Sequence, residues 1–94
     1  MGLELVELIL DIQDHYGITL PEDEADPEET ATFGGFVTWI HRTINASQNA
    51  PLRVKELSLK DVENEVRSII CEEFGFKPEK VRWESHLIKD LGLG

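Results

Sequence analysis

The stretch LELVELILDIQDHYGITLP, residues 3–21, decides the fold. Its apolar residues recur at spacings of three and four, which is the period of an α-helix with one side facing a core. These residues are Leu5, Leu8, Ile9, Ile12 and Tyr16. We expect the helix to end at Gly17, because glycine commonly terminates helices. The chain after it should be extended, since Pro21 keeps Leu20 out of the helical region.

A second helix is predicted after Thr32, because threonine is a common N-cap and the residues that follow repeat an apolar face. The inward residues are Phe33, Phe36, Val37, Ile40 and Ile44, and the helix should end near Asn45. Gly34 and Gly35 each weaken a helix by about 1 kcal/mol relative to alanine. We therefore expect packing, rather than helix propensity, to stabilise this helix.

A third helix is predicted from about Lys60 to Glu73, with Ser58 or Leu59 near its start and Gly75 as its stop. Its inward residues are Val62, Val66, Ile69, Ile70 and Phe74. The three predicted helices thus each present one apolar face to a shared core.

The other segments are expected to connect these helices. The acidic stretch 21–26 predicts one short helix, because proline suits a first helical turn. Residues 46–59 begin with small polar residues and proline, which predicts a linker. Residues 76–94 predict a long loop anchored by Phe76, Val81, Trp83, Leu87, Ile88 and Leu91. No alternation of period two persists, so the predicted fold class is all-α, with three main helices and one short helix.

Length and composition narrow the classes of protein. The chain has 94 residues and a formal net charge of −10, which fits one domain over residues 1–94. The single Cys71 cannot form an internal disulfide, and no apolar run reaches the roughly 18 residues of a membrane span. No basic segment precedes the first apolar stretch, so a cytoplasmic location is expected. The negative charge disfavours nucleic acid and favours a partner with a basic surface.

The charge is concentrated in the first half of the chain. Residues 1–45 hold ten acidic side chains against Arg42 alone, a net charge of −9. The first helix carries an acidic ridge and an apolar strip, both at helical spacing. The ridge comprises Glu4, Glu7, Asp11 and Asp14, and the strip comprises Leu3, Val6 and Leu10. Two interpretations are open from the pattern alone: a solvated charged face beside ordinary surface leucines, which is the commoner case, or a face that binds a partner.

The residues that most often carry catalysis or bind metals form no recognisable constellation. His15, His41 and His86 are scattered, and Cys71 has no partner at the spacing of a nucleophilic or zinc site. The acidic stretch 22–26 lacks the spacing of a calcium loop. The sequence therefore predicts a protein that is not an enzyme and binds no metal.

The two ends of the chain suggest a different order of elements. The first helix begins by residue 3 without a preceding cap, and the long loop LIKDLGL, residues 87–93, leads to no further element. If Gly94 were joined to Gly2, this loop would enter the first helix directly. The linker 46–59 has fourteen residues and extends to about 46–50 Å, which is enough to connect the other two ends.

Read as residues 58–94 followed by residues 2–45, the chain resembles an acyl carrier protein over nearly its whole length. In that family a first helix is followed by a long loop that ends in D-L-G-x-D-S-L, and a second helix starts after the serine. The matching segments are VRSIICEEFGF (66–76), KDLGLG (89–94), LELVELIL (3–10), YGITLP (16–21) and the threonine-capped TFG (32–34). The resemblance implies a circularly permuted four-helix bundle, with family helices II–IV in residues 1–45 and helix I with its loop in residues 60–94.

The resemblance also carries implications for cofactor and partners. The family's serine bears 4'-phosphopantetheine, but its position falls on Gly2, between Gly94 and Leu3. Because glycine has no hydroxyl, no phosphopantetheine is expected on the chain as written. The family docks acyl-chain-processing enzymes, such as those of fatty acid biosynthesis, through the acidic second helix. This implies docking through the helix at residues 3–16, where Glu7 lies in the V-E-L motif.

Two alternatives remain open from the sequence. The chain is either such a carrier-like scaffold or a non-carrying regulatory module whose acidic helix binds a basic partner surface. The linker also permits two chains to exchange halves, so a domain-swapped dimer stands beside the monomer.

Overall fold

The structure, a computed structural model, describes residues 3–93 and is all-α over that range. Its α-helices are α1 (Leu3–Tyr16), α2 (Phe33–Ala46), α3 (Leu52–Lys55) and α4 (Leu59–Phe74). Three short 3-10 helices, η1 (Glu22–Glu24), η2 (Glu29–Ala31) and η3 (Pro78–Lys80), lie between or after them. The described residues contain no strand, and Thr32 and His86 form an isolated antiparallel bridge. The predicted fold class is confirmed in these terms.

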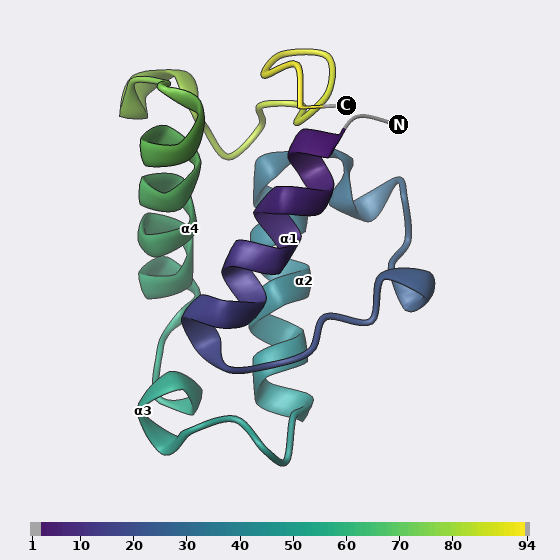
Figure 1. The fold of residues 1–94 in the computed structure, drawn as a ribbon, viewed down its shortest axis with the longest axis vertical. Coiled ribbons are helices and arrows are strands. Elements are labelled where there is room, and N and C mark those ends of the chain that lie inside the picture. The colour runs from purple at the N-terminus through teal and green to yellow at the C-terminus, as the bar shows by residue number, and fades with distance from the viewer. Residues whose placement is uncertain (1–2, 94) are drawn as a thin grey trace.

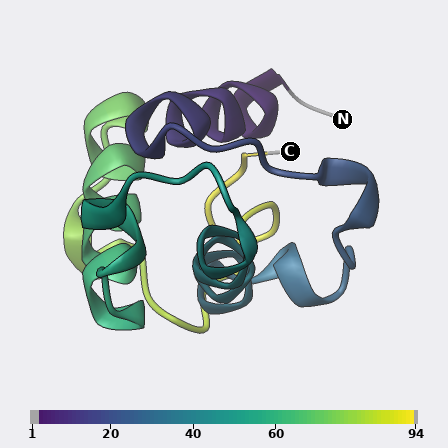
Figure 2. The same ribbon diagram turned by 90° about the horizontal axis from the view of Figure 1, so that it is seen from below.

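The three long helices pack around one core. Figure 1 shows α1 lying across α2, with α4 beside both, and the loop after α4 running across the end of the molecule at which α1 begins; Figure 2 shows the three helices from below. The radius of gyration is 12.3 Å, close to the roughly 12 Å expected of a compact domain of this length. The core is formed by Leu8, Ile12, Tyr16, Phe33, Phe36, Val37, Ile40, Ile44, Val62, Val66, Ile70, Val81, Leu87 and Leu93, among others.

The helices begin and end at the cap residues that the sequence predicts. Ser58 is the N-cap of α4 and forms a capping box, in which its hydroxyl accepts from the Asp61 N–H and the Asp61 carboxylate accepts from the Ser58 N–H. Gly17 and Gly75 follow α1 and α4 with φ of 68° and 76°, in the left-handed region that glycine adopts freely. Thr32 caps α2, its hydroxyl accepting from the Gly35 N–H at 3.1 Å.

The two glycines at the start of α2 are required by close packing. A Cβ on Gly34 would lie 2.6 Å from Trp83 Nε1, and a Cβ on Gly35 would overlap the carbonyl oxygen of Glu29. The Phe33 N–H donates to the Ser85 carbonyl at 2.7 Å, and the Gly34 N–H donates to the Trp83 carbonyl at 2.8 Å. The first turn of α2 is thus held between η2 and the loop 83–87, a contact that we call the α2 clamp.

Three parts of the predicted organisation are wrong or incomplete. The linker 46–59 contains a helical turn of its own, α3, because Pro51 precedes it and Val54 is 99% buried in the core. The acidic stretch 21–26 forms the 3-10 helix η1, so the one short α-helix lies in the linker instead. Ile88 was expected to anchor the last loop but is 50% exposed, whereas Leu93, which was not predicted, is buried.

The α2 clamp predicts the effect of adding one methyl group. Replacing glycine by alanine in a helix ordinarily stabilises it by about 1 kcal/mol. We expect Gly35→Ala to destabilise the protein by about 1–3 kcal/mol, because the backbone of η2 must move to admit the methyl group. Urea unfolding measures the change. Ser68→Ala, at an exposed position in α4, serves as the control and should leave stability within about 0.5 kcal/mol. A Gly35→Ala variant more stable than the wild type would contradict the clamp.

Candidate functional site

The outer face of α1 presents acidic side chains beside one large apolar side chain. The side chains of Glu4, Glu7, Asp11 and Asp14 are exposed. The side chain of Leu10, beside this row of carboxylates, is 53% exposed. The opposite face of the helix is buried against α2 and α4 through Leu8, Ile12 and Tyr16. The pattern of core residues therefore turns the predicted acidic ridge outward. We call Glu4, Glu7, Leu10, Asp11 and Asp14 the acidic face.

Val6 does not share the exposure of Leu10. It is half-buried and lines an apolar pocket of about 290 Å³ at the junction of α1, η1 and α2. The pocket is lined by Leu5, Val6, Ile9, Glu22, Ala25, Pro27, Thr30, Phe36 and Trp39. Trp39 forms part of the core and one wall of this pocket. Its volume is at the lower end of the range for small-molecule pockets.

A carboxylate of α4 extends the negative charge of the acidic face. Glu73 lies beside Asp11 and Glu7, and the side-chain contact with Asp11 raises the pKa of Glu73 to about 7, with partial burial and the two carboxylate charges adding to the effect. Glu73 is 62 residues from Asp11 in the chain and is not among the residues that the sequence predicts for this face. No local pattern marks it, because only the packing of α4 against α1 brings the two side chains together.

A second polar contact joins the same two helices. His15 Nε2 lies 3.1 Å from Glu65 Oε1, and the His15 ring meets the edge of the Tyr16 ring at 4.7 Å between centroids. Burial raises the pKa of the Tyr16 hydroxyl above its usual range, and the nearby Glu65 charge adds to the increase. These contacts give His15 a structural role at the end of α1.

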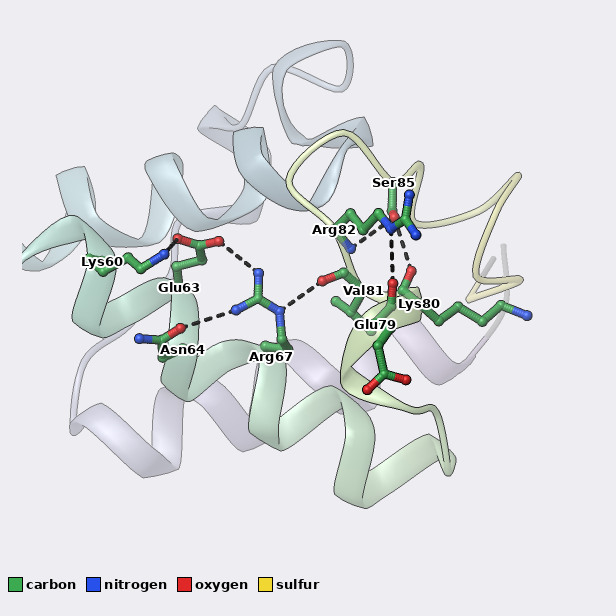
Figure 3. A network of polar contacts seen from close by, with 9 residues as sticks. All are labelled: Lys60, Glu63, Asn64, Arg67, Glu79, Lys80, Val81, Arg82 and Ser85. Carbon is green, nitrogen blue, oxygen red and sulfur yellow. Dashed lines mark hydrogen bonds and ion pairs between the residues drawn. The ribbon is translucent and has the colours of Figure 1, made fainter.

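The loop that follows α4 is fixed by one arginine (Figure 3). Arg67 Nε donates to the Val81 carbonyl at 2.8 Å, and its terminal nitrogens donate to Glu63 at 2.7 Å and Asn64 at 3.1 Å. The Arg67 guanidinium also lies 5.1 Å from the centre of the Phe33 ring, on the first turn of α2. The hydrogen bond from Arg67 lowers the pKa of Glu63. Arg67 therefore joins α4, the loop and the α2 clamp.

A buried serine fixes the next part of this loop. Ser85 Oγ donates to the Lys80 carbonyl at 3.1 Å and accepts from the Arg82 N–H at 3.0 Å, as Figure 3 shows. Arg82 Nε in turn donates to the Glu79 carbonyl. Ser85 is thus a structural residue, and Trp83, which is 42% exposed, anchors the loop by covering Gly34.

The remaining predicted positions are placed as follows. Gly2 and Gly94, at the expected attachment position, lie outside the described residues, as does the side chain of Leu3. Cys71 is half-buried in α4, and burial raises the pKa of its thiol. Glu22 at the start of η1 lines the apolar pocket.

Across residues 3–93, no helix is both long enough and apolar enough to cross a membrane.

Comparison with known proteins returned no relative. No protein-family model, no curated protein and no solved structure matches the chain.

The Glu73 and Asp11 pair predicts how stability changes with pH. Glu73 has a higher pKa in the folded state than in the unfolded chain, so its contribution is complete below about pH 4.5 and is lost as the pH rises through about 7. We expect Glu73→Gln to be more stable than the wild type at pH 8, by less than about 1 kcal/mol because the pair is exposed to solvent. Urea unfolding at pH 5 should show a smaller difference.

The matched control is Glu84→Gln, which removes the same charge from an exposed loop position. It should change stability similarly at both pH values. If Glu73→Gln gave no gain at pH 8 over Glu84→Gln, the carboxylate pair would not destabilise the fold.

Proposed function

We propose that the chain is an acyl-carrier-protein-like scaffold that docks acyl-chain-processing enzymes through α1 and carries no phosphopantetheine as written. The observation that carries the proposal is the acidic face, where four exposed carboxylates lie beside one exposed leucine on a single helix. Carboxylates attract a basic patch over a distance, and an apolar side chain fixes the register once the surfaces meet.

The arrangement of the helices supports a carrier-like reading of the element order. The final loop ends near the first turn of α1 in both Figure 1 and Figure 2. The sequence α4, loop, α1, η1 and α2 therefore follows a continuous path in space. In this reading, α1 corresponds to the family's docking helix, and the segment 46–59 connects the elements at the other end of the molecule.

The apolar pocket favours a second role for the same scaffold. It opens beside α1, and its wall includes Val6, Ile9 and Phe36 with few polar groups. Such a lining suits an aliphatic chain better than a charged ligand, since Glu22 at the pocket would repel a carboxylate. We infer that an alkyl chain presented by a docked enzyme would enter here.

The docking proposal is tested by charge reversal on α1. A Glu4→Lys, Glu7→Lys double variant should bind a carrier-using acyl-processing enzyme at least about tenfold more weakly at low salt, because two attractive contacts become repulsive. Its binding should also depend less steeply on salt. Isothermal titration calorimetry at two salt concentrations measures both effects.

The control is a Glu56→Lys, Glu84→Lys double variant, which makes the same change in net charge at exposed positions outside α1. It should retain most of the affinity. Equal weakening by the two variants would show that net charge alone governs binding. A wild-type chain that binds basic proteins but no carrier-using enzyme would favour the regulatory alternative.

The absence of a carrier arm is tested by mass spectrometry. Incubation with a phosphopantetheinyl transferase and coenzyme A should leave the mass unchanged, because the expected attachment position is Gly2. Of the serines that remain, Ser58 caps α4 and Ser85 is buried in the last loop. An authentic acyl carrier protein in the same reaction confirms that the transferase is active. A phosphopantetheine-sized increase in mass would overturn this part of the proposal.

A further inference from the structure

The last loop contains a closed turn that begins at His86. The Asp90 N–H donates to the His86 carbonyl at 2.9 Å, and the Gly92 N–H donates to the Ile88 carbonyl at 2.9 Å. Gly92, with φ of 68°, ends the turn in the left-handed conformation that commonly terminates a helix. Residues 86–92 therefore form one helical turn, which we call the His86 turn.

The imidazole of His86 occupies the N-cap position of this turn. His86 Nδ1 accepts hydrogen bonds from the Ile88 N–H at 3.2 Å and the Lys89 N–H at 3.0 Å. The Asp90 carboxylate accepts from the His86 N–H at 2.7 Å, a reciprocal bond like that of a capping box but made by the residue one position later. A nitrogen that accepts two hydrogen bonds has no proton, so the ring is neutral, with its proton on Nε2.

We propose that the His86 turn is a pH-sensitive element, closed by the neutral imidazole and opened when His86 is protonated. A proton on Nδ1 converts the acceptor into a donor that faces two N–H groups. Both hydrogen bonds are then lost at once, and the two N–H groups must turn to water. Histidine is the side chain whose charge ordinarily changes between pH 5 and 8.

The charged groups around the turn permit this protonation. On the turn itself, the Asp90 carboxylate, which accepts from the His86 N–H, favours an imidazolium, and Lys89 supplies a positive charge in the same segment. Earlier in the loop, Arg82 and Glu84 contribute one charge of each sign. The facing segment contributes the uncharged Thr32, which bridges to His86, while Glu29 of η2 is paired with Arg42. The surroundings thus place no excess of positive charge against a protonated His86.

The His86 turn holds the corner of the molecule beside α1. Leu87 and Leu91 are buried, and the Leu87 N–H donates to the Ala31 carbonyl at 2.8 Å. Figures 1 and 2 show this part of the loop at the same end of the molecule as the first turn of α1. Opening the turn would therefore weaken the attachment of this loop to η2, at the end of the molecule where α1 begins.

Hydrogen exchange of two amides tests the proposal. NMR should show that the protection of the Ile88 and Lys89 amides, corrected for the pH dependence of intrinsic exchange, falls about tenfold between pH 8 and pH 5. His86→Asn keeps an acceptor at the N-cap but does not titrate, so its protection should be the same at both pH values. The His15→Gln and His41→Gln variants should retain the wild-type response.

Two results would overturn the proposal. One is wild-type protection that does not change with pH, and the other is a His86→Asn variant with the same pH response as the wild type. The nitrogen resonances of the His86 ring give a test that needs no variant. At pH 8 they should show an unprotonated Nδ1 and a protonated Nε2, and a ring protonated on Nδ1 would contradict the cap. None of these measurements involves a binding partner, so their outcome is independent of the docking proposal.

Discussion

The constraint on which the structure depends is the lack of space at the first turn of α2. Gly34 packs against Trp83 and Gly35 against the Glu29 carbonyl, and the N–H groups of Phe33 and Gly34 reach the loop carbonyls of Ser85 and Trp83. Unpaired N–H groups at a helix start are costly when buried, so the loop replaces the water that would otherwise solvate them. These hydrogen bonds fix the position of the long last loop against α2. Arg67 of α4 fixes the same loop by donating a hydrogen bond to the Val81 carbonyl.

The acidic face and its neighbours follow from this arrangement. With the core residues of α1 turned inward, Glu4, Glu7 and Leu10 face solvent. Rising pH ionises Glu73 beside Asp11 and weakens the contact of α1 with α4. The proposed opening of the His86 turn would act at the end of the molecule where α1 begins.

The sequence predicts the helices and caps well because those features depend on nearby residues. Ser58, Thr32 and Gly17 each act within one turn of the helix that they begin or end. What the sequence did not predict depends on distant contacts. Helix α3 forms because the Val54 side chain is buried in the core. Glu73 lies beside Asp11 only once α4 packs on α1. The reason for the glycine at position 34 likewise lies about 50 residues away, at Trp83.

The most direct measurement is NMR mapping of the chain in complex with a carrier-using acyl-processing enzyme. Docking through α1 predicts that the amide resonances of Glu4, Glu7, Leu10, Asp11 and Asp14 shift or broaden at low enzyme concentration, while those of α3 do not change. Perturbations centred on α3 or the 46–59 segment, with none on α1, would contradict the account.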